Sequence, residues 1–388
     1  MSIEPSYHST ANQNNEMSTQ LPVIIIGAGV SGLTLAQACQ KKNIPFRIFE
    51  RDDSASLSQH RIAGKGLTEG WPLDVLNDAL PDELVLRLSE CYVNRGGVSF
   101  DEDDYCDLFF LNTGESKMAT PTSKRIRVSR EKFRSLLLTG IDVECSKTLA
   151  EISVADDSVK AVFSDGTSET GSIVIGCDGL DSTMRRIMHP QGYPKPKHFE
   201  FRHLLATASY PTSEVSTIRN MHPFFLHCRH LETDVLLLIT FFEDTPEDSH
   251  SDDMTKCQLM LQWPYRPNWL GRVDPTDCPN TKIGQRALLK QLSDSWAEPF
   301  RSLVHNMPRD ADVRPFDDGY AGFSPAFGCR VSLAGRAANP LNTRMGKFAE
   351  SASADVQYKL GWLERMYSAE GNFDWEAYED ELREIASF

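Results

Sequence analysis

The sequence predicts an α/β fold in which a Rossmann-like dinucleotide-binding domain is interleaved with a mainly β second domain. Three observations favour this fold. The apolar run Val23–Ile26 leads directly into a glycine-rich turn and an apolar helix, and a second short strand follows over residues 46–49. Farther along, strand-like apolar segments recur between residues 191 and 315, at 204–208, 223–226 and 235–242.

The glycine-rich turn has the form G-x-G-x-x-G and is made by Gly27, Gly29 and Gly32. In such a turn the first glycine permits the tight bend, the second lets backbone N–H groups approach a pyrophosphate, and the third lets the helix pack closely on the strand. The pyrophosphate then lies at the helix N-terminus. Glu50 ends the second strand about twenty residues beyond the turn, where a carboxylate binds the ribose hydroxyls of a dinucleotide. The four residues together predict dinucleotide binding, whereas the glycine pattern alone is weak evidence.

A second motif lies far downstream, where residues 174–182 read Val-Ile-Gly-Cys-Asp-Gly-Leu-Asp-Ser and Arg185 follows. Together with residues 27–51, this segment resembles the class A FAD-dependent monooxygenases of the para-hydroxybenzoate hydroxylase type. The resemblance implies FAD as cofactor and NAD(P)H as cosubstrate. It also implies that the aspartate of this motif lies near the flavin ribityl chain and the pyrophosphate. The cofactor-binding residues expected from these two segments therefore also include Arg51, Asp178 and Gly179. An Asp-Gly pair by itself would indicate only a turn.

Between these motifs, residues 126–130 predict a strand that leads into a helix over 131–138, with Ser129 as its N-cap. In the resembling family, the arginine at the position of Arg130 reaches the cofactor. The alternative is that Arg130 is a surface residue on the first turn of this helix.

The third motif of the family, G-D-A-A-H-P, is altered in this chain. After Gly335, Arg336 replaces the acidic residue, and Asn339 replaces the histidine. The missing aspartate would hydrogen-bond the ribityl chain, and one such charged hydrogen bond contributes about 1.5–3 kcal/mol. Arg336 can offset part of this loss by pairing with the pyrophosphate. We therefore expect Arg336 to bind the cofactor in a different way from the residue it replaces.

The loop after this motif also departs from the family pattern G-x-G-x-N. Gly346 is kept, whereas Phe348 replaces a glycine and Glu350 replaces the asparagine; Asp355 matches the acid of the following helix. In the family, backbone N–H groups of this loop stabilise negative charge on the flavin edge. Phe348 can block the ring and Glu350 adds charge of the wrong sign, or the loop repacks so that both side chains point away. Gly346 is expected to remain a cofactor-binding residue.

The resemblance implies a Rossmann-like FAD-binding domain with an interleaved β-sheet substrate domain, as in para-hydroxybenzoate hydroxylase. The leader, rich in Ser, Asn and Gln, lacks the basic and apolar regions of a secretory signal. The expected parts are a disordered leader (1–20), a discontinuous FAD-binding domain (21–190 and 316–365), a mainly β substrate-binding domain (191–315) and a C-terminal helix (366–388).

Composition excludes several classes of partner. The formal net charge of −15 argues against binding to a phosphate backbone, so nucleic acid is not an expected partner. The nine cysteines include no C-x-x-C pair, which favours reduced thiols and a cytoplasmic protein. No apolar run of about eighteen residues is present, so no integral membrane segment is expected. The spacing of His222, His227 and His230 matches no zinc-site pattern, and no metal is expected.

The function expected from the resemblance is a monooxygenase that inserts one oxygen atom from O2 into a small, largely apolar organic substrate in secondary-metabolite biosynthesis. The altered third motif leaves two alternatives open. One is the same fold repurposed for a non-redox cyclisation, isomerisation or lyase step with weak or absent FAD. The other is a non-catalytic relative that stabilises a partner. The sequence identifies no catalytic acid or base; Arg61, Tyr210, His227 and Tyr320 are candidates only by their place in the chain.

Overall fold

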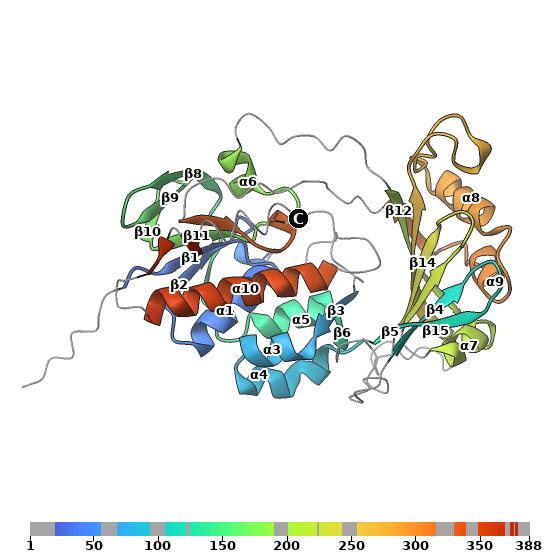
Figure 1. Cartoon of the computed structure of the whole chain (residues 1–388), viewed down its shortest axis with the longest axis horizontal. Coiled ribbons are helices and arrows are strands. Elements are labelled where there is room, and N and C mark those ends of the chain that lie inside the picture. The colour runs from blue at the N-terminus through green and yellow to red at the C-terminus, as the bar shows by residue number, and fades with distance from the viewer. Residues whose placement is uncertain are drawn as a thin grey trace, which may run out of the picture.

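The computed structural model describes residues 20–55, 68–93, 105–121, 125–189, 201–222, 225–242, 254–315, 330–338, 348–368, 373–375 and 377–378. These residues form two lobes, and each lobe contains a central sheet (Figure 1). The expected α/β class is confirmed: one sheet is parallel and covered by helices, and the other is largely antiparallel.

The nucleotide-binding lobe is built on a five-stranded parallel sheet in the order β17-β11-β1-β2-β7. The central strand β1 is almost completely buried, because residues 23 and 25 pack into one core and residues 24 and 26 into another. A parallel strand covered on both faces reads as a continuous apolar run, as this one does. The strands are β1 (Val23–Ile26), β2 (Phe46–Phe49), β7 (Val143–Glu144), β11 (Ile173–Gly176) and β17 (Val331–Leu333).

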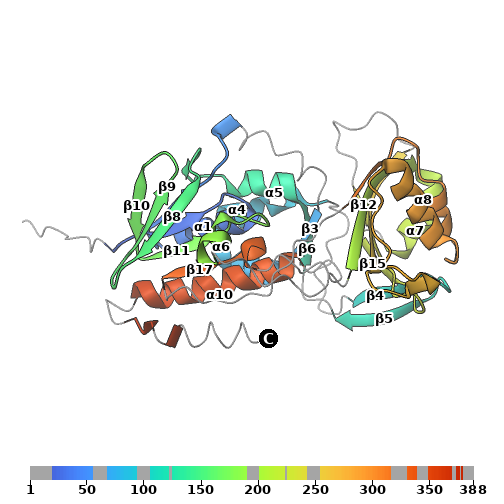
Figure 2. The same ribbon diagram turned by 90° about the horizontal axis from the view of Figure 1, so that it is seen from above.

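Helices cover one face of this sheet, and a three-stranded antiparallel sheet packs on the other (Figures 1 and 2). The helical elements of the lobe are α1 (Val30–Lys41), α3 (Leu73–Ala79), α4 (Asp82–Arg87), η2 (Leu88–Cys91), α5 (Arg130–Leu137), α6 (Thr183–Met188), η5 (Gly335–Ala337) and α10 (Phe348–Ser368). The small sheet comprises β8 (Leu149–Val154), β9 (Val159–Phe163) and β10 (Ser168–Gly171). A separate ribbon pairs β3 (Thr68–Pro72) with β6 (Arg125–Ser129).

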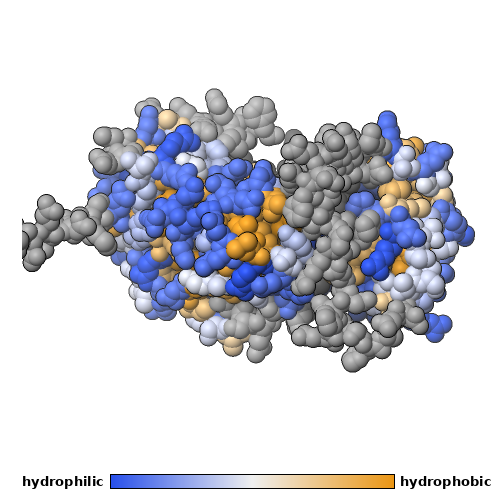
Figure 3. Space-filling model, turned by 90° about the horizontal axis from the view of Figure 1, so that it is seen from below, coloured by the Kyte–Doolittle hydropathy of each residue, from blue (hydrophilic) through white to orange (hydrophobic). Residues whose placement is uncertain are grey.

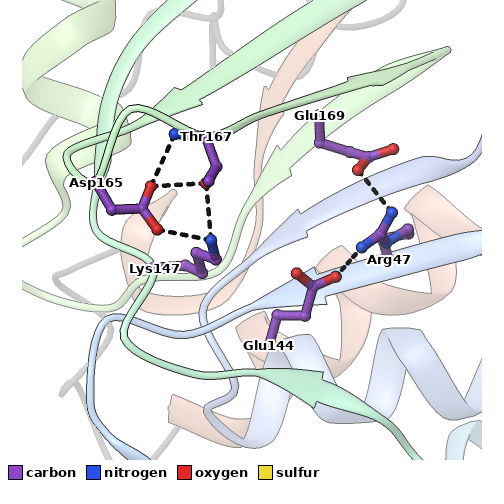
Figure 4. Close-up of polar contacts among 6 residues, drawn as sticks. All are labelled: Arg47, Glu144, Lys147, Asp165, Thr167 and Glu169. Carbon is purple, nitrogen blue, oxygen red and sulfur yellow. Dashed lines mark hydrogen bonds and ion pairs between the residues drawn. The ribbon is translucent and has the colours of Figure 1, made fainter.

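Charged contacts join the small sheet to the edge of the parallel sheet (Figure 4). The guanidinium of Arg47 on β2 donates to Glu169 of β10 at 2.7 Å and also to Glu144 of β7. Before β8, the Lys147 ammonium lies 2.7 Å from a carboxylate oxygen of Asp165 and donates to the Thr167 hydroxyl. Because these pairs are partly exposed, they add little to stability, and the apolar contacts between the sheets contribute most of the packing energy.

The second lobe is a seven-stranded sheet in the order β16-β12-β15-β14-β13-β4-β5. Helices α7 (Thr212–Met221), α8 (Lys282–Ser293) and α9 (Phe300–His305) cover its outer face, and the opposite face is directed toward the nucleotide-binding lobe (Figures 1 and 2). A 3-10 turn, η4 (Trp269–Gly271), follows β15. The strands are β4 (Tyr105–Phe110), β5 (Ser116–Pro121), β12 (Phe201–Pro211), β13 (Phe225–Arg229), β14 (Leu236–Phe241), β15 (Met254–Pro264) and β16 (Asp312–Pro315).

The strands predicted at 204–208 and 235–242 are confirmed within β12 and β14. The expected domain boundaries differ from the structure at two points. Strands β4 and β5 fall within the predicted 21–190 domain, yet they extend the seven-stranded sheet, because β4 pairs with β13. Helix α10 runs without a break through the predicted boundary at 365. Residues 1–19 of the predicted leader, residues 223–224 and most of the chain after 368 lie outside the described residues.

The C-terminal part of the described chain packs against α10 through aromatic rings. Tyr378 lies 4.8 Å from Trp362 between ring centroids, and Phe373 lies 5.5 Å from the same indole. These contacts attach Phe373 and Tyr378 to the outside of the nucleotide-binding lobe.

Figure 3 shows a face on which hydrophilic residues predominate in the nucleotide-binding lobe, with a prominent apolar patch among them. Every helix within the described ranges is too short or too polar to span a bilayer.

Candidate cofactor-binding site

The three glycines of the turn between β1 and α1 have different surroundings. Gly27 has a φ of +105°, and a Cβ there would lie 2.7 Å from the Cys177 carbonyl oxygen. A Cβ at Gly32 would lie 2.0 Å from the Gly27 carbonyl oxygen. At Gly29, by contrast, the nearest described atom to such a Cβ is the Cys177 carbonyl oxygen, 3.9 Å away. Packing therefore requires glycine at positions 27 and 32, whereas position 29 leaves room for a ligand.

The N-terminus of α1 begins at this open position. Gly29 is the N-cap residue, and within the described part of the chain no side chain caps the helix and no acidic residue lies in its first turn. The first N–H groups of a helix have no partner within the helix, and the helix dipole favours an anion there. This end of α1 therefore suits the pyrophosphate of a dinucleotide.

Glu50 binds the turn from the end of β2. Its two carboxylate oxygens accept from the backbone N–H groups of Ala28, at 2.8 Å, and Asp52, at 3.1 Å. Carboxylate oxygens have further lone pairs for a ribose hydroxyl, so the predicted role of Glu50 is compatible with these bonds. It also has a structural role that its spacing did not reveal, because it fixes the glycine turn to the second strand.

Arg134 of α5 completes this corner of the site, and the sequence analysis did not single it out. Its Nε donates to the Ala28 carbonyl oxygen at 3.0 Å. Burial lowers the pKa of Arg134, and the nearby Glu50 carboxylate partly opposes that effect. A signal for this residue was present, since Arg134 lies four positions after Arg130 and therefore on the same side of the helix. The predicted N-cap of α5 is confirmed: the Ser129 hydroxyl accepts from the Lys132 N–H.

Asp178 lies in the loop between β11 and α6. One carboxylate oxygen, Oδ2, accepts from the Met184 N–H at 3.0 Å. The other, Oδ1, is buried and has no hydrogen-bond partner among the residues that the structure describes. Gly179 has a φ of +80°, and no described atom lies within 4 Å of the position of its Cβ. A buried oxygen without a donor is costly, so Oδ1 fits a ligand hydroxyl such as those of the ribityl chain.

Arg185 connects this loop to the altered third motif. Its guanidinium donates to the carbonyl oxygens of Ala337, at 3.1 Å, and Arg336, at 3.4 Å, and to the carbonyl oxygen of Leu180. The position of the second loop is therefore coupled to that of η5.

The third motif also contacts the first. Gly335 has a φ of +62°, and a Cβ there would lie 2.3 Å from the Ser31 hydroxyl oxygen in the first turn of α1. The N–H of Gly335 donates to Asp355 of α10 at 2.9 Å, so Asp355 does close this motif as its position predicts. The structure thus brings all three motifs together around the N-terminus of α1.

The remaining predicted residues are only partly described. Arg51, Arg130 and Arg336 are half-buried in this lobe, and their contact with a cofactor stays a prediction. Gly346 and Asn339 lie outside the described residues, as do the side chains of Phe348 and Glu350.

Four residues were candidates for a role in the substrate pocket. Tyr210 is buried on the helix-covered side of the second sheet, where its hydroxyl donates to the Leu303 carbonyl oxygen at 2.8 Å, so it does not face the pocket. His227 lies on the opposite face, in a shallow pocket. Arg61 and Tyr320 lie outside the described residues.

The fold and the site together define a dinucleotide-binding flavoprotein class, and comparison with known proteins identifies the family. Residues 25–83 match the family described as NAD(P)-binding Rossmann-like domain. The chain is 32% identical to the FAD-dependent monooxygenase tazP of Aspergillus terreus over 374 residues, which cover 90% of this chain and 91% of that protein. It is 31% identical to the FAD-dependent monooxygenase dbaB of Emericella nidulans over 359 residues, or 87% and 86% of the two chains. This chain belongs to the FAD-dependent monooxygenases, and it is an enzyme whose cofactor is FAD and whose cosubstrate is NAD(P)H.

Solved structures share the fold at lower sequence identity. HpxO of Klebsiella pneumoniae, solved in complex with FAD and uric acid, superposes with a TM-score of 0.62 at 16% identity, covering 94% of this chain and 83% of that one. The predicted para-hydroxybenzoate hydroxylase-like fold is confirmed.

Proposed function

We propose that this enzyme inserts one oxygen atom from O2 into a small, largely apolar organic molecule in the biosynthesis of a secondary metabolite. The observation that carries the proposal is the convergence of the three motifs on the first turn of α1, with the buried Oδ1 of Asp178 beside it. When bound, FAD takes a hydride from NAD(P)H and activates O2 for transfer of one oxygen atom to the substrate.

The residues of this chain bind and orient the cofactor. N–H groups at the start of α1 hold the pyrophosphate, Glu50 accepts from a ribose hydroxyl, and Asp178 accepts from the ribityl chain. Arg336 pairs with the pyrophosphate in place of the missing acid. The complete set of proposed cofactor-binding residues is Gly27, Gly29, Gly32, Glu50, Arg51, Arg130, Asp178, Gly179, Arg336 and Gly346.

We also propose a compartment for the enzyme, which the thiols support. The seven cysteines whose side chains the structure describes are all free. Free thiols suit a reducing compartment, so we place the enzyme in the cytoplasm.

The visible spectrum of the purified protein tests the proposal. We expect a bound oxidised flavin that NAD(P)H reduces, with consumption of O2 when a substrate is present. A colourless protein that takes up no FAD on titration yet converts a substrate without O2 would support the non-redox alternative. A protein that binds FAD but never consumes NAD(P)H would contradict the proposed reaction while leaving the cofactor site in place.

A further inference from the structure

The inner face of the seven-stranded sheet carries an apolar row. Leu205 of β12, Met260 of β15 and Leu238 of β14 are register partners on adjacent strands, and His227 of β13 follows Leu238. The neighbours of Met260 in the chain, Leu259 and Leu261, pack in the helix-covered core, so this row faces the other way, toward the nucleotide-binding lobe.

A second row crosses the same face beside the first. In it, Gln262 of β15 is the register partner of His203 on β12 and of Leu236 on β14. Gln262 lines a shallow pocket together with Leu108, His227, Leu236, Leu238 and Met260. The pocket is therefore mostly apolar, and its polar side chains are the Gln262 amide and the His227 imidazole.

The side-chain amide of Gln262 has a hydrogen-bond partner for its oxygen but, among the described residues, none for its nitrogen. Its side chain is 97% buried, and Nε2 has no hydrogen-bond acceptor within the described ranges. Burial lowers the pKa of His203 to about 4, and a side-chain hydrogen bond with Gln262 partly opposes that effect. A bond that favours the protonated ring nitrogen is one in which the imidazole donates and the amide oxygen accepts. The amide nitrogen then remains as a buried donor.

Gln258 provides an internal comparison. It lies on the same strand and the same face and is equally buried, with an exposed fraction of 6%. Its Nε2 has a partner, because it donates to the Thr207 hydroxyl at 3.4 Å. A buried amide donor without an acceptor is costly. Of these two glutamines only Gln262 has such a donor among the described residues, and this difference needs an explanation.

We propose that Gln262 is a specificity-determining residue that donates a hydrogen bond from Nε2 to the carbonyl oxygen of a planar, apolar substrate. The ring system of this substrate lies on Leu236, Leu238 and Met260. The inference rests on the proposed function, because it names the substrate class of the same enzyme. A site built to hydrogen-bond one substrate atom rejects analogues that lack that atom, since its own polar group is then left unpaired.

A matched pair of probes tests this inference. Methyl naphthyl ketone and isopropenylnaphthalene have the same shape and differ only in C=O against C=CH2. Equilibrium dialysis against the FAD-loaded protein should show about tenfold tighter binding of the ketone, which corresponds to about 1.4 kcal/mol. The variant Gln262→Leu should bind both probes equally, and the control Gln258→Leu should keep the wild-type preference.

A second variant distinguishes the loss of the amide donor from a loss of folded structure. Gln262→Leu leaves the His203 imidazole without its acceptor, whereas Gln262→Glu keeps an acceptor and, in its ionised form, replaces the amide donor with a second, charged acceptor. We expect Gln262→Glu to lose the ketone preference while its far-ultraviolet circular dichroism stays that of the wild type. The inference is wrong if the wild type shows no preference, if neither probe binds, or if both Gln262 variants retain the preference.

The same preparations separate this inference from the proposed function. Probe binding is measured at equilibrium without turnover, and the flavin spectrum and NAD(P)H oxidation are recorded independently. A ketone preference that depends on Gln262 in a protein without NAD(P)H oxidation would overturn the proposed reaction and leave the inference standing. Flavin reduction and O2 uptake without that preference would overturn the inference and leave the proposed reaction standing.

Discussion

At the scale of single residues, the buried His203 makes the stability of the folded protein depend on pH. Its side chain is 6% exposed, and burial lowers the pKa of its imidazole from 6.5 to about 4. Above pH 6.5 the ring is neutral in both the folded and the unfolded chain. Below pH 6.5 the unfolded chain binds a proton that the folded protein excludes, so stability falls as the pH falls toward 4. The total loss from this group is about 3 kcal/mol.

The variant His203→Gln tests this link, because it removes the titrating ring and keeps a donor for Gln262. Urea unfolding at about pH 7.5 and about pH 4.5 should show that the free energy of unfolding falls less with acid in the variant than in the wild type. An equal fall in both proteins would mean that His203 is not the titrating group.

Also at this scale, the glycines of the first turn should separate binding from folding. Gly29→Val places a branched side chain where a pyrophosphate is expected, in an extended backbone that valine tolerates, so FAD affinity should be lost and the melting temperature kept. Gly32→Ala brings a Cβ to 2.0 Å from the Gly27 carbonyl oxygen and should destabilise the fold itself. FAD titration and thermal melts measure the two effects. Unchanged FAD affinity in a folded Gly29→Val protein would refute the dinucleotide site.

At the scale of elements, Arg185 joins the loop after β11 to η5 through three carbonyl oxygens. Arg185→Met keeps much of the side-chain length and removes every donor. We expect FAD binding to weaken about tenfold, because the loop of Asp178 is no longer held against the third motif. Arg186→Met is the matched control, since Arg186 is exposed and its guanidinium donates to Thr183 of its own helix. Similar losses in the two variants would assign the effect to charge alone.

The elements also show where sequence patterns suffice. The turn of Gly27, Gly29 and Gly32 is a local pattern, and so are the apolar runs within β12 and β14. Both were predicted because neighbours in the chain determine them. The pairing of β4 with β13 joins segments more than a hundred residues apart, and no local pattern reports it. The unpaired amide of Gln262 was not predictable either, because it depends on which side chains the register of three strands brings together.

At the scale of the whole molecule, the chain passes between the two lobes several times. It enters the second lobe for β4 and β5, returns for β6, enters again for β12 to β16 and returns for β17. The third motif follows this last return and contacts the first turn of α1, so the cofactor site is complete only when both ends of the nucleotide-binding lobe have assembled. The altered residues of that motif therefore bear on the activity of the entire enzyme.

The last prediction concerns these altered residues. If Arg336, Phe348 and Glu350 have weakened an otherwise intact flavin site, the triple variant Arg336→Asp, Phe348→Gly and Glu350→Asn should bind FAD more tightly and oxidise NAD(P)H faster than the wild type. Arg336 lies in the third motif, and Phe348 and Glu350 lie at the start of the helix that follows it. We therefore expect their effects to be non-additive, which the single variants would reveal. The measurements are FAD titration and NAD(P)H consumption in all four variants. If the wild type already binds FAD tightly and the triple variant loses both the flavin and the activity, Arg336 is itself a cofactor ligand, and the third motif of this enzyme binds FAD through an arginine.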